Sequence, residues 1–506
     1  MRKRKLGIAA VVLAGGVAVT AFAVSPAIAE PKADIDWKPC EDVDDKAVTC
    51  ATIEVPLDYS DPDGETIEIG LARREATNPD ERIGTILADP GGPGGSGVEM
   101  VQAGTPLTPA VSERFDVVGF DPRGINTSTQ IVCDEELAAQ AEELKTPTSA
   151  EEFDELAKVN GDLAADCRER TGELYDHVDN LHTAQDMDAI REALGEEKLN
   201  YLGYSYGSLM GQQYAEMFPD RIRAMVNDGN MDHSLESTWD FVSTETAPVE
   251  ASFENFADWC EGEEKCALNG QDVREAYAGL RDAAEAGELV DPETGDPIGF
   301  YDLSSTTFGG VTHPSGWSDL AEQYAALIEG RASDADVDAV KGAETNFVLQ
   351  GVWCQDWGYE VADYDEWESM MSQLSEEYPN VQWSPYVSHA LTCVGYPGET
   401  TNPRAPLEIE DAPPLVMLGN VYDPATVYAW NEVAAEQSGS DLITYEGYGH
   451  TIYGRDSDCV NDLVDAYFLE LKAPGNTSCP GVEEPGSDAG ADSVTSPNGP
   501  VPYAKS

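Results

Sequence analysis

A serine between two glycines is the first feature of the sequence with a recognisable chemistry. The segment Gly203-Tyr204-Ser205-Tyr206-Gly207 follows an apolar run at Leu199 to Gly203 and precedes a stretch with helical spacing, Ser208 to Phe218. A sharp turn between a strand and a helix lifts a serine hydroxyl above the edge of a sheet, and the glycines tolerate the crowded backbone. This context predicts that Ser205 is a nucleophile, and the alternative is a glycine-rich helix start without chemistry.

A nucleophilic serine needs a base and an acid, and the chain has only six histidines. In parallel sheets with this turn, the acid and then the base follow the nucleophile along the chain. His450 is the histidine that lies in a loop after a late core strand. Asp423 comes after the preceding core strand, whereas Asp411 lies before that strand and Asp456 after the histidine. The order predicts Asp423 as the acid and His450 as the base. Thr426 is expected to cap the next helix and could also brace the loop of the acid.

Acyl transfer also requires hydrogen-bond donors for the oxyanion that develops at the reacting carbonyl. The glycine-rich segment from Asp89 to Gly97 follows a predicted strand, and its glycines allow backbone N–H groups to face the substrate. We expect the N–H groups of Gly92 and Tyr206 to form this oxyanion hole. A phosphate-binding loop is the weaker interpretation, because the lysine of that motif is missing.

The elements that must position these residues follow a repeated strand and helix pattern. Four apolar runs read as buried strands, namely Ile83 to Ala88, Phe115 to Phe120, Leu199 to Gly203 and Ile222 to Val226. Helical spacing separates them, for example from Ala184 to Leu194. This alternation predicts the α/β class with a mostly parallel sheet flanked by helices.

The pattern stops after the fourth strand and resumes at Leu415, followed by a helix from Thr426 and a strand at Leu442 to Tyr445. The interval is too long for a loop, so we expect a large, mainly helical lobe inserted before the strand that carries the acid. The predicted division is a signal peptide at 1–29, a core at 30–229, an inserted cap lobe at 230–411, a second part of the core at 412–479 and a disordered tail at 480–506.

The N-terminus has the three parts of a secretory signal: basic residues Arg2 to Lys5, an apolar run, and Ala27-Ile28-Ala29 as the cleavage site. An uncleaved membrane anchor is the alternative, but the many Gly and Ala residues make the run weakly hydrophobic. We expect a secreted, extracellular protein with no stable membrane span after cleavage.

The ten cysteines are an even number in a chain expected to be exported, which favours disulfides. Sequence alone does not give their connectivity. Pairing of neighbours would join Cys40 to Cys50, Cys133 to Cys167, Cys260 to Cys266, Cys354 to Cys393 and Cys459 to Cys479. No CxxC motif or Cys/His cluster indicates zinc, and the Asp61-Pro62-Asp63-Gly64 turn lacks the ligands of a calcium loop, so we expect no metal and no cofactor.

The charge of the chain limits its partners. Asp and Glu number 96 against 29 Lys and Arg, which gives a formal net charge of −67. Such a surface repels phosphate backbones, so nucleic acid is excluded as the main partner. Because the acidic residues are spread over the whole chain, we hypothesise adaptation to a salty exterior.

Together, these motifs resemble the secreted tripeptidyl and prolyl aminopeptidase-like serine peptidases of the α/β-hydrolase fold. The resemblance covers nearly all of the chain after the signal. It rests on the following segments: Val55-Pro56-Leu57-Asp58-Tyr59, the glycine loop Gly91 to Gly97, Asp121-Pro122-Arg123-Gly124, the Ser205 segment with Tyr214-Ala215 and Phe218-Pro219, Asp423-Pro424-Ala425-Thr426 and Gly449-His450.

The resemblance implies Ser205, Asp423 and His450 as the catalytic triad, in agreement with their order, and supports a Cys354 to Cys393 disulfide. It also implies that carboxylates hold the α-ammonium of a peptide substrate, for which Asp356 is the candidate. The leading hypothesis is a secreted serine exopeptidase acting on peptide substrates. An esterase, amidase or endopeptidase of the same fold is the first alternative, and a non-catalytic binding protein is the second. The sequence does not give the oligomeric state.

Overall fold

The structure, a computed structural model, describes residues 35–41, 43–332, 346–483 and 485–486. The signal peptide expected at 1–29 lies outside these residues. No helix in the described part of the chain is long and apolar enough to cross a membrane.

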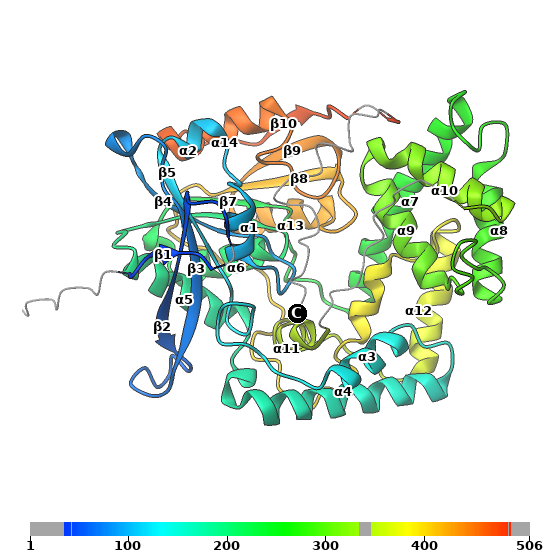
Figure 1. Ribbon diagram of the computed structural model, residues 1–506, viewed down its shortest axis with the longest axis horizontal. Helices are drawn as coiled ribbons and strands as arrows, with labels where there is room; N and C mark the ends of the chain where they lie inside the picture. Colours follow the sequence, from blue (N-terminus) through cyan, green and yellow to red (C-terminus); the bar gives the residue numbers. More distant parts are fainter. Residues whose placement is uncertain (1–34, 42, 333–345, 484, 487–506) are drawn as a thin grey trace, which may run out of the picture. The chain divides into compact units, whose positions relative to one another are not determined.

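A single large sheet forms the centre of the described chain (Figure 1). Its order is β1-β2-β3-β5-β4-β6-β7-β8-β9-β10. The strands are β1 (Lys38–Pro39), β2 (Val48–Pro56), β3 (Thr66–Arg74), β4 (Gly84–Asp89), β5 (Phe115–Phe120), β6 (Leu199–Tyr204), β7 (Ile222–Asp228), β8 (Val416–Tyr422), β9 (Asp441–Tyr448) and β10 (Thr477–Pro480). β1, β2 and β3 pair antiparallel, and so do β3 and β5, whereas every pairing from β5 to β10 is parallel. The predicted α/β class is confirmed.

The strands β4 to β8 are buried on both faces because helices cover each side of the sheet. Successive residues point to opposite faces, so Leu87 packs in one apolar cluster and its neighbours Ile86 and Ala88 in another. The first cluster includes side chains of α5 and α6, and the second includes those of α1 and α14. Continuous apolar runs were therefore the correct signal for these strands.

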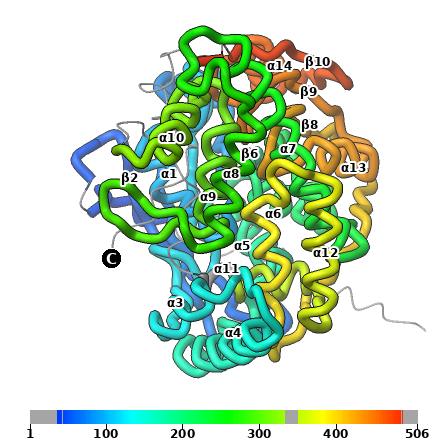
Figure 2. The backbone as a smooth tube through the Cα atoms, turned by 90° about the vertical axis from the view of Figure 1, so that its right-hand side faces the viewer, coloured from blue at the N-terminus to red at the C-terminus, as the bar shows by residue number. Residues whose placement is uncertain are grey.

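The helices are α1 (Gly97–Ala103), α2 (Pro109–Ser112), α3 (Glu135–Leu144), α4 (Ala150–Thr171), α5 (Asn180–Ala193), α6 (Tyr206–Met217), α7 (Thr238–Gly262), α8 (Val273–Glu285), α9 (Phe300–Thr312), α10 (Trp317–Glu329), α11 (Asn346–Asp356), α12 (Tyr364–Glu377), α13 (Tyr428–Ser438) and α14 (Asp458–Glu470). In the described parts of the chain, the helices α7 to α12 come between β7 and β8. Helices α7 to α10 share an apolar cluster of their own, built around aromatic residues such as Phe256, Tyr277 and Tyr324. Figure 2 shows these helices side by side.

The helices α3 and α4 precede the nucleophile in sequence, but α3 packs against α11, and α4 packs against both α11 and α12 (Figure 1). The amide of Asn160 on α4 donates to the carbonyl oxygens of Leu391 and Val394, at 3.1 and 3.0 Å. The sequence predicted that α3 and α4 belong to the core at 30–229. The spacing of apolar residues in a helix does not show which neighbouring element the apolar face contacts.

Five disulfides cross-link the described chain, and they join the cysteines that are neighbours in sequence. Of the connectivities that the sequence left open, this is the simplest. The pair Cys354 and Cys393, which the resemblance supported, is among them.

The C-terminal boundary predicted at residue 480 is too early. Pro480 is the last residue of β10. Beyond it, Glu483 accepts a hydrogen bond from the hydroxyl of Tyr445, and the N–H of Gly486 donates to the carbonyl of Pro314. The tail was predicted from its low hydrophobicity. Glu483 and Gly486 are instead held by hydrogen bonds to neighbouring segments, which need no apolar side chains. The rest of the predicted tail lies outside the described residues.

Candidate active site

Ser205 lies at a sharp turn between β6 and α6. Its φ of 54° and ψ of −123° are uncommon for a residue with a side chain, and such a backbone persists only where its surroundings hold it. A Cβ on Gly203 would lie 2.4 Å from the carbonyl oxygen of Gly207, and a Cβ on Gly207 would lie 2.9 Å from that of Asp89. The N–H of Ser205 donates to the carbonyl of Asp228 at 2.9 Å. The strand, turn and helix expected around Ser205 are therefore present, and both glycines are required by close packing.

Asp423 and His450 form a close pair. His450 Nδ1 lies 2.9 Å from Oδ2 and 3.1 Å from Oδ1 of Asp423, which is fully buried. The carboxylate also accepts from the N–H groups of Ala425 and Thr426 and from the Thr426 hydroxyl. These donors fix the carboxylate, so it can hold the imidazole through Nδ1 and leave Nε2 for proton transfer. Thr426 braces the acid as expected, but it does not cap α13, whose N-cap residue is Val427.

Asp228 connects the loop of the base to the strand beside the nucleophile. Its Oδ2 accepts from the N–H groups of residues 452 and 453, at 2.8 and 2.7 Å, while its carbonyl accepts from Ser205. A Cβ on the next residue, Gly229, would lie 3.4 Å from His450 Cε1. No hydrogen bond joins Ser205 to His450 within the described residues, and such bonds are often long before substrate binds. Serine and histidine therefore share one end of the sheet.

The glycine-rich loop, residues 90–96, lies directly against the turn at Ser205. A Cβ on Gly91 would lie only 2.6 Å from the nitrogen of Tyr206, and the φ of Gly91 is 89°. Asp89 accepts a hydrogen bond from the N–H of Gly91 at 2.8 Å, which fixes the start of the loop. Tyr206 opens α6, so its N–H has no acceptor inside the helix. The two N–H groups expected to form the oxyanion hole, those of Gly92 and Tyr206, thus belong to backbone segments in contact.

Asp356 lies at the end of α11 in a buried hydrogen-bond network. Its Oδ2 accepts from the Tyr206 hydroxyl at 2.7 Å, and its Oδ1 accepts from the N–H of Asn180 and the amide of Asn402. Burial, together with the nearby charge of Asp179, raises the pKa of Asp356 to about 7. The network joins the residue after the nucleophile to the start of α5.

This network corrects the role expected for Asp356. The side chain is fully buried, and both of its oxygens already accept hydrogen bonds from the chain itself. Oδ1 uses both of its lone pairs on donors of the chain, and the lone pair that remains on Oδ2 belongs to a side chain with no exposed surface for a substrate ammonium to reach. We therefore assign Asp356 a positioning role rather than the amine-binding role expected from the resemblance.

Glu245, on α7, is a carboxylate that the sequence analysis missed. Its side chain is 2% exposed, and Oε2 has no hydrogen-bond partner among the described groups. Burial raises its pKa well above the usual range, and the charge of Asp423 raises it further. Helix α7 packs against β8, the strand that precedes Asp423. The sequence did contain a signal for this residue, namely a Glu within the apolar pattern of a long helix. Glu is almost never fully buried without a partner, so a Glu at such a position indicates a carboxylate with a role.

His313, just after α9, is a second missed neighbour of the site. A Cβ on Gly449 would lie 2.4 Å from His313 Cε1, so this histidine packs on the residue before His450. Burial lowers the pKa of His313 to about 4, and it is neutral at neutral pH. The helices between β7 and β8 therefore reach the loop of the candidate base.

Among the described residues, the candidate triad is not part of a group of three potential metal ligands. Within the part of the chain that the structure describes, one group of three such residues is present, Asp58, His177 and His182, and it includes none of the residues above.

The chain is similar to known proteins over most of its length. A family model described as TAP-like protein matches residues 379–479, and one for the alpha/beta hydrolase fold matches residues 85–251. A tripeptidyl aminopeptidase of Streptomyces coelicolor is 31% identical over 463 residues, which cover 87% of this chain and 84% of that protein. The chain belongs to the tripeptidyl aminopeptidase-like, or TAP-like, family of serine hydrolases.

Other TAP-like relatives carry different names. Serine protease Hip1 of Mycobacterium tuberculosis is 29% identical over 483 residues, covering 88% of this chain and 91% of that protein. Carboxylesterase B of the same species is 30% identical over 463 residues, covering 85% of each. The family therefore includes proteins named as peptidases and a protein named as an esterase.

Proposed function

We propose that this TAP-like protein is an exported serine exopeptidase that releases short peptides or proline-adjacent residues from the N-termini of peptides. The observation that carries the exopeptidase assignment is Glu245, a buried carboxylate on α7 whose Oε2 has no hydrogen-bond partner among the described residues. Helix α7 packs against β8, the strand that precedes the acid of the candidate triad. A peptide with a free N-terminus brings an ammonium group, which is the partner that such a carboxylate lacks.

The reaction proceeds through an acyl-enzyme on Ser205. Ser205 Oγ attacks the carbonyl carbon of the scissile bond while His450 Nε2 takes its proton, and Asp423 holds the resulting imidazolium. The N–H groups of Gly92 and Tyr206 stabilise the oxyanion. His450 then protonates the leaving amine, and water hydrolyses the ester by the same steps. The Asp423–His450 pair at 2.9 Å and the contact of Gly91 with Tyr206 support this scheme.

Glu245 distinguishes free from blocked N-termini. Without substrate, burial and the charge of Asp423 raise the pKa of Glu245, so both disfavour its ionised form. A bound ammonium favours the ionised form and forms a charge-assisted hydrogen bond. Peptides with an acetylated N-terminus cannot make this bond, so they are poor substrates.

The test is a comparison of two tripeptide arylamides that differ only in an N-terminal acetyl group. We expect kcat/KM to be about 100-fold higher for the free amine, which corresponds to roughly 2.7 kcal/mol. Glu245→Gln should abolish this preference mainly through KM. Glu236→Gln, at an exposed position before α7, is the matched control and should retain it. Equal rates on free and acetylated peptides in the wild type would remove the exopeptidase assignment.

An esterase or amidase is the second candidate function, because the relative carboxylesterase B shares 30% identity with this chain. The same triad can accept esters. Simple aryl esters, assayed beside the two peptides, decide between the candidates. A kcat/KM for esters far above that for the free-amine peptide would favour the esterase.

Export is the remaining part of this proposal. Five disulfides in the described residues are typical of proteins that fold in an oxidising compartment. The signal pattern at residues 1–29 agrees with this. The mature N-terminus, read by sequencing the protein from culture medium, should follow Ala29, and a protein retained inside the cell with its leader would contradict it.

A further inference from the structure

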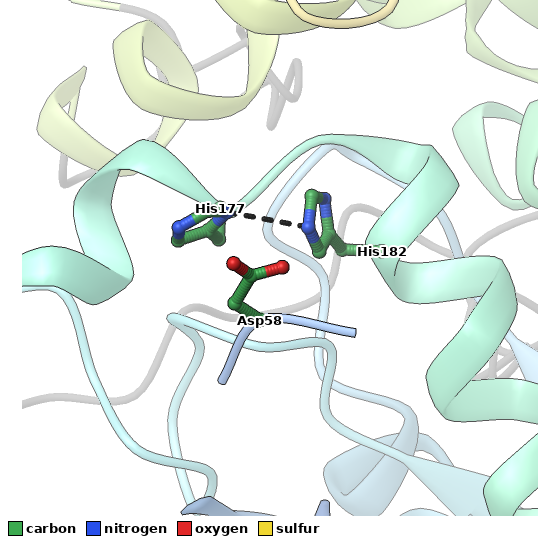
Figure 3. Close-up of side chains that lie close together, drawn as sticks. All are labelled: Asp58, His177 and His182. Atoms are coloured by element: carbon green, nitrogen blue, oxygen red, sulfur yellow. Dashed lines mark hydrogen bonds between the residues drawn. The ribbon is translucent and has the colours of Figure 1, made fainter. Parts of the chain in front are cut away.

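Three potential metal ligands meet on the described chain outside the candidate active site (Figure 3). Asp58 follows β2, His177 follows a short 3-10 helix at Glu173–Asp176, and His182 lies in the first turn of α5. One ligand atom from each lies within 4.8 Å of the others, and all three side chains are half-buried. The two histidines are close in sequence, but Asp58 lies far before them, so no compact ligand motif marked this site and we expected no metal.

The two imidazoles face each other through ring nitrogens. His177 Nδ1 lies 3.2 Å from His182 Nε2. Two imidazole nitrogens on one tetrahedral ion, at Zn–N distances of 2.0–2.1 Å, are separated by about 3.3 Å. The two nitrogens therefore already have the spacing of two ligands on one ion. The proton of their hydrogen bond lies where the ion would bind.

A carboxylate fixes the orientation of one imidazole. His182 Nδ1 lies 2.9 Å from Oδ2 and 3.0 Å from Oδ1 of Asp179, which is buried and also accepts from Thr401. With its proton on Nδ1, His182 has a lone pair on Nε2, directed at His177. A carboxylate behind a histidine is the usual partner of a metal-binding imidazole, because it fixes the tautomer and raises the basicity.

The carboxylate ligand is also held in place. Asp58 Oδ1 accepts from the N–H of Ser60 and Oδ2 accepts from the Ser60 hydroxyl, each at 2.7 Å. Each carboxylate oxygen has two lone pairs, so one on each remains for an ion. Figure 3 shows the carboxylate of Asp58 directed at the two imidazoles.

Arg123 holds the segments that carry two of the ligands. It is fully buried and paired with Asp186, and its Nη1 donates to the carbonyl oxygens of Leu57 and His177, both at 2.9 Å. Leu57 precedes Asp58 in the chain. The backbone of both ligands is therefore fixed by one rigid guanidinium, so little ordering remains for metal binding.

We propose that Asp58, His177 and His182 bind one divalent transition-metal ion of the zinc type, with water completing the coordination. Two imidazoles and one carboxylate favour such an ion over Ca²⁺ or Mg²⁺, which prefer oxygen ligands. When the ion binds, the proton between the two imidazoles moves to Nε2 of His177, so Nδ1 of His177 and Nε2 of His182 each present a lone pair to the ion. The ion also cross-links the end of β2 to the start of α5, and it stabilises the fold.

Zinc binding by the full-length mature protein tests this proposal. Protein treated with a chelator and desalted is titrated with Zn²⁺ against a chromophoric chelator, in 1 M NaCl to screen the acidic surface. We expect one tight site per chain and a higher melting temperature with Zn²⁺ but not with equimolar Ca²⁺. X-ray absorption of the loaded wild type should show imidazole nitrogen at 2.0–2.1 Å. A shell of oxygen only would overturn the proposal.

Variants locate the site. His177→Gln and His182→Gln should each weaken Zn²⁺ binding by about 100-fold, and Asp58→Asn by about 10-fold. Asp63→Asn, an exposed carboxylate in the turn between β2 and β3, is the matched control and should bind as the wild type does. Far-UV circular dichroism and peptidase activity verify folding, because none of these residues contacts the triad. Tight binding that survives in both histidine variants would overturn the proposal.

Discussion

Thr426 shares its hydroxyl between the acid and the base of the candidate triad. Its Oγ1 donates to Asp423 Oδ2 at 2.9 Å and lies 3.3 Å from His450 Nδ1. The hydroxyl thus occupies the side of the carboxylate that faces the imidazole. A hydrogen bond to a charged group contributes about 1.5–3 kcal/mol.

Thr426→Val should therefore lower kcat by about 10- to 100-fold with little change in KM, because this hydroxyl is buried and bonds to the acid. The methyl groups keep the shape of the side chain, and the N–H groups of residues 425 and 426 still hold the acid. Thr426→Ser restores the hydroxyl and should recover most of the activity. Steady-state kinetics on a peptide arylamide measure both, and equal losses in the two variants would contradict the bracing role.

The raised pKa of Asp356 predicts that the stability of the protein depends on pH. Burial and Asp179 raise its pKa to about 7, above its usual value near 3.9. The protonated form is therefore favoured in the folded protein, so its contribution is complete below about pH 4 and is lost as the pH rises through 7.

Between pH 4 and pH 8, the free energy of unfolding of the wild type should fall by up to about 4 kcal/mol more than that of Asp356→Asn, since one pKa unit corresponds to about 1.4 kcal/mol. Urea unfolding at several pH values measures the free energy of unfolding of both proteins. Because both contain the same other acidic groups, the contribution of those groups cancels when the two curves are subtracted. Parallel curves would show that Asp356 is ionised throughout.

Residue types and their order were enough to choose Ser205, Asp423 and His450 as candidates, because parallel strands bring their following loops to one edge of the sheet. Burial was not predictable in the same way. Asp356 and Glu245 are both acids in an acid-rich part of the chain, and only packing distinguishes them. Asp356 uses its oxygens within the protein, whereas Glu245 keeps one unpartnered.

At the scale of elements, the glycine loop and the nucleophile turn form one backbone unit. A Cβ at position 91 would lie 2.4 Å from the carbonyl oxygen of Tyr204 and 2.6 Å from the nitrogen of Tyr206, at a φ that side chains rarely adopt. Both segments carry a donor of the proposed oxyanion hole. Any shift of one segment changes the distance between the two donors.

Gly91→Ala should therefore reduce kcat by about 100-fold or more, as removal of one oxyanion donor does elsewhere. Gly104→Ala is the matched control, because no atom lies within 4 Å of a Cβ there and its φ is extended. Circular dichroism should show both variants folded. Wild-type turnover by Gly91→Ala would mean that the loop is not part of the oxyanion hole.

Elements with continuous apolar runs were predicted well, since strands buried on both faces have no other pattern. The strand predicted at Phe115–Phe120 has the same bounds in the structure. The position of α4 was not predictable, because its contact with the segment around Cys393 depends on close backbone approach. Gly395 at φ 84° lies against Ala157, where a Cβ would come within 1.8 Å of the carbonyl oxygen.

At the scale of the whole molecule, the net charge of −67 sets the dependence of stability on salt. Like charges on the surface destabilise the compact state, and salt screens them over a Debye length of about 10 Å at 0.1 M and about 3 Å at 1 M. The melting temperature should therefore rise between 0.1 and 2 M NaCl, most steeply at the lower concentrations where the Debye length changes most. Differential scanning calorimetry measures it, and an unchanged or falling melting temperature would remove the hypothesis of adaptation to salt.

The central claim is that Ser205 forms the acyl-enzyme, and covalent labelling tests it most directly. Intact-protein mass spectrometry after treatment with a fluorophosphonate should show one adduct, mapped to Ser205, with complete loss of peptidase activity. Ser205→Ala should take no label and should lose about four to six orders of magnitude in kcat. A Ser205→Ala protein that keeps wild-type turnover, or a label on another residue, would contradict this account.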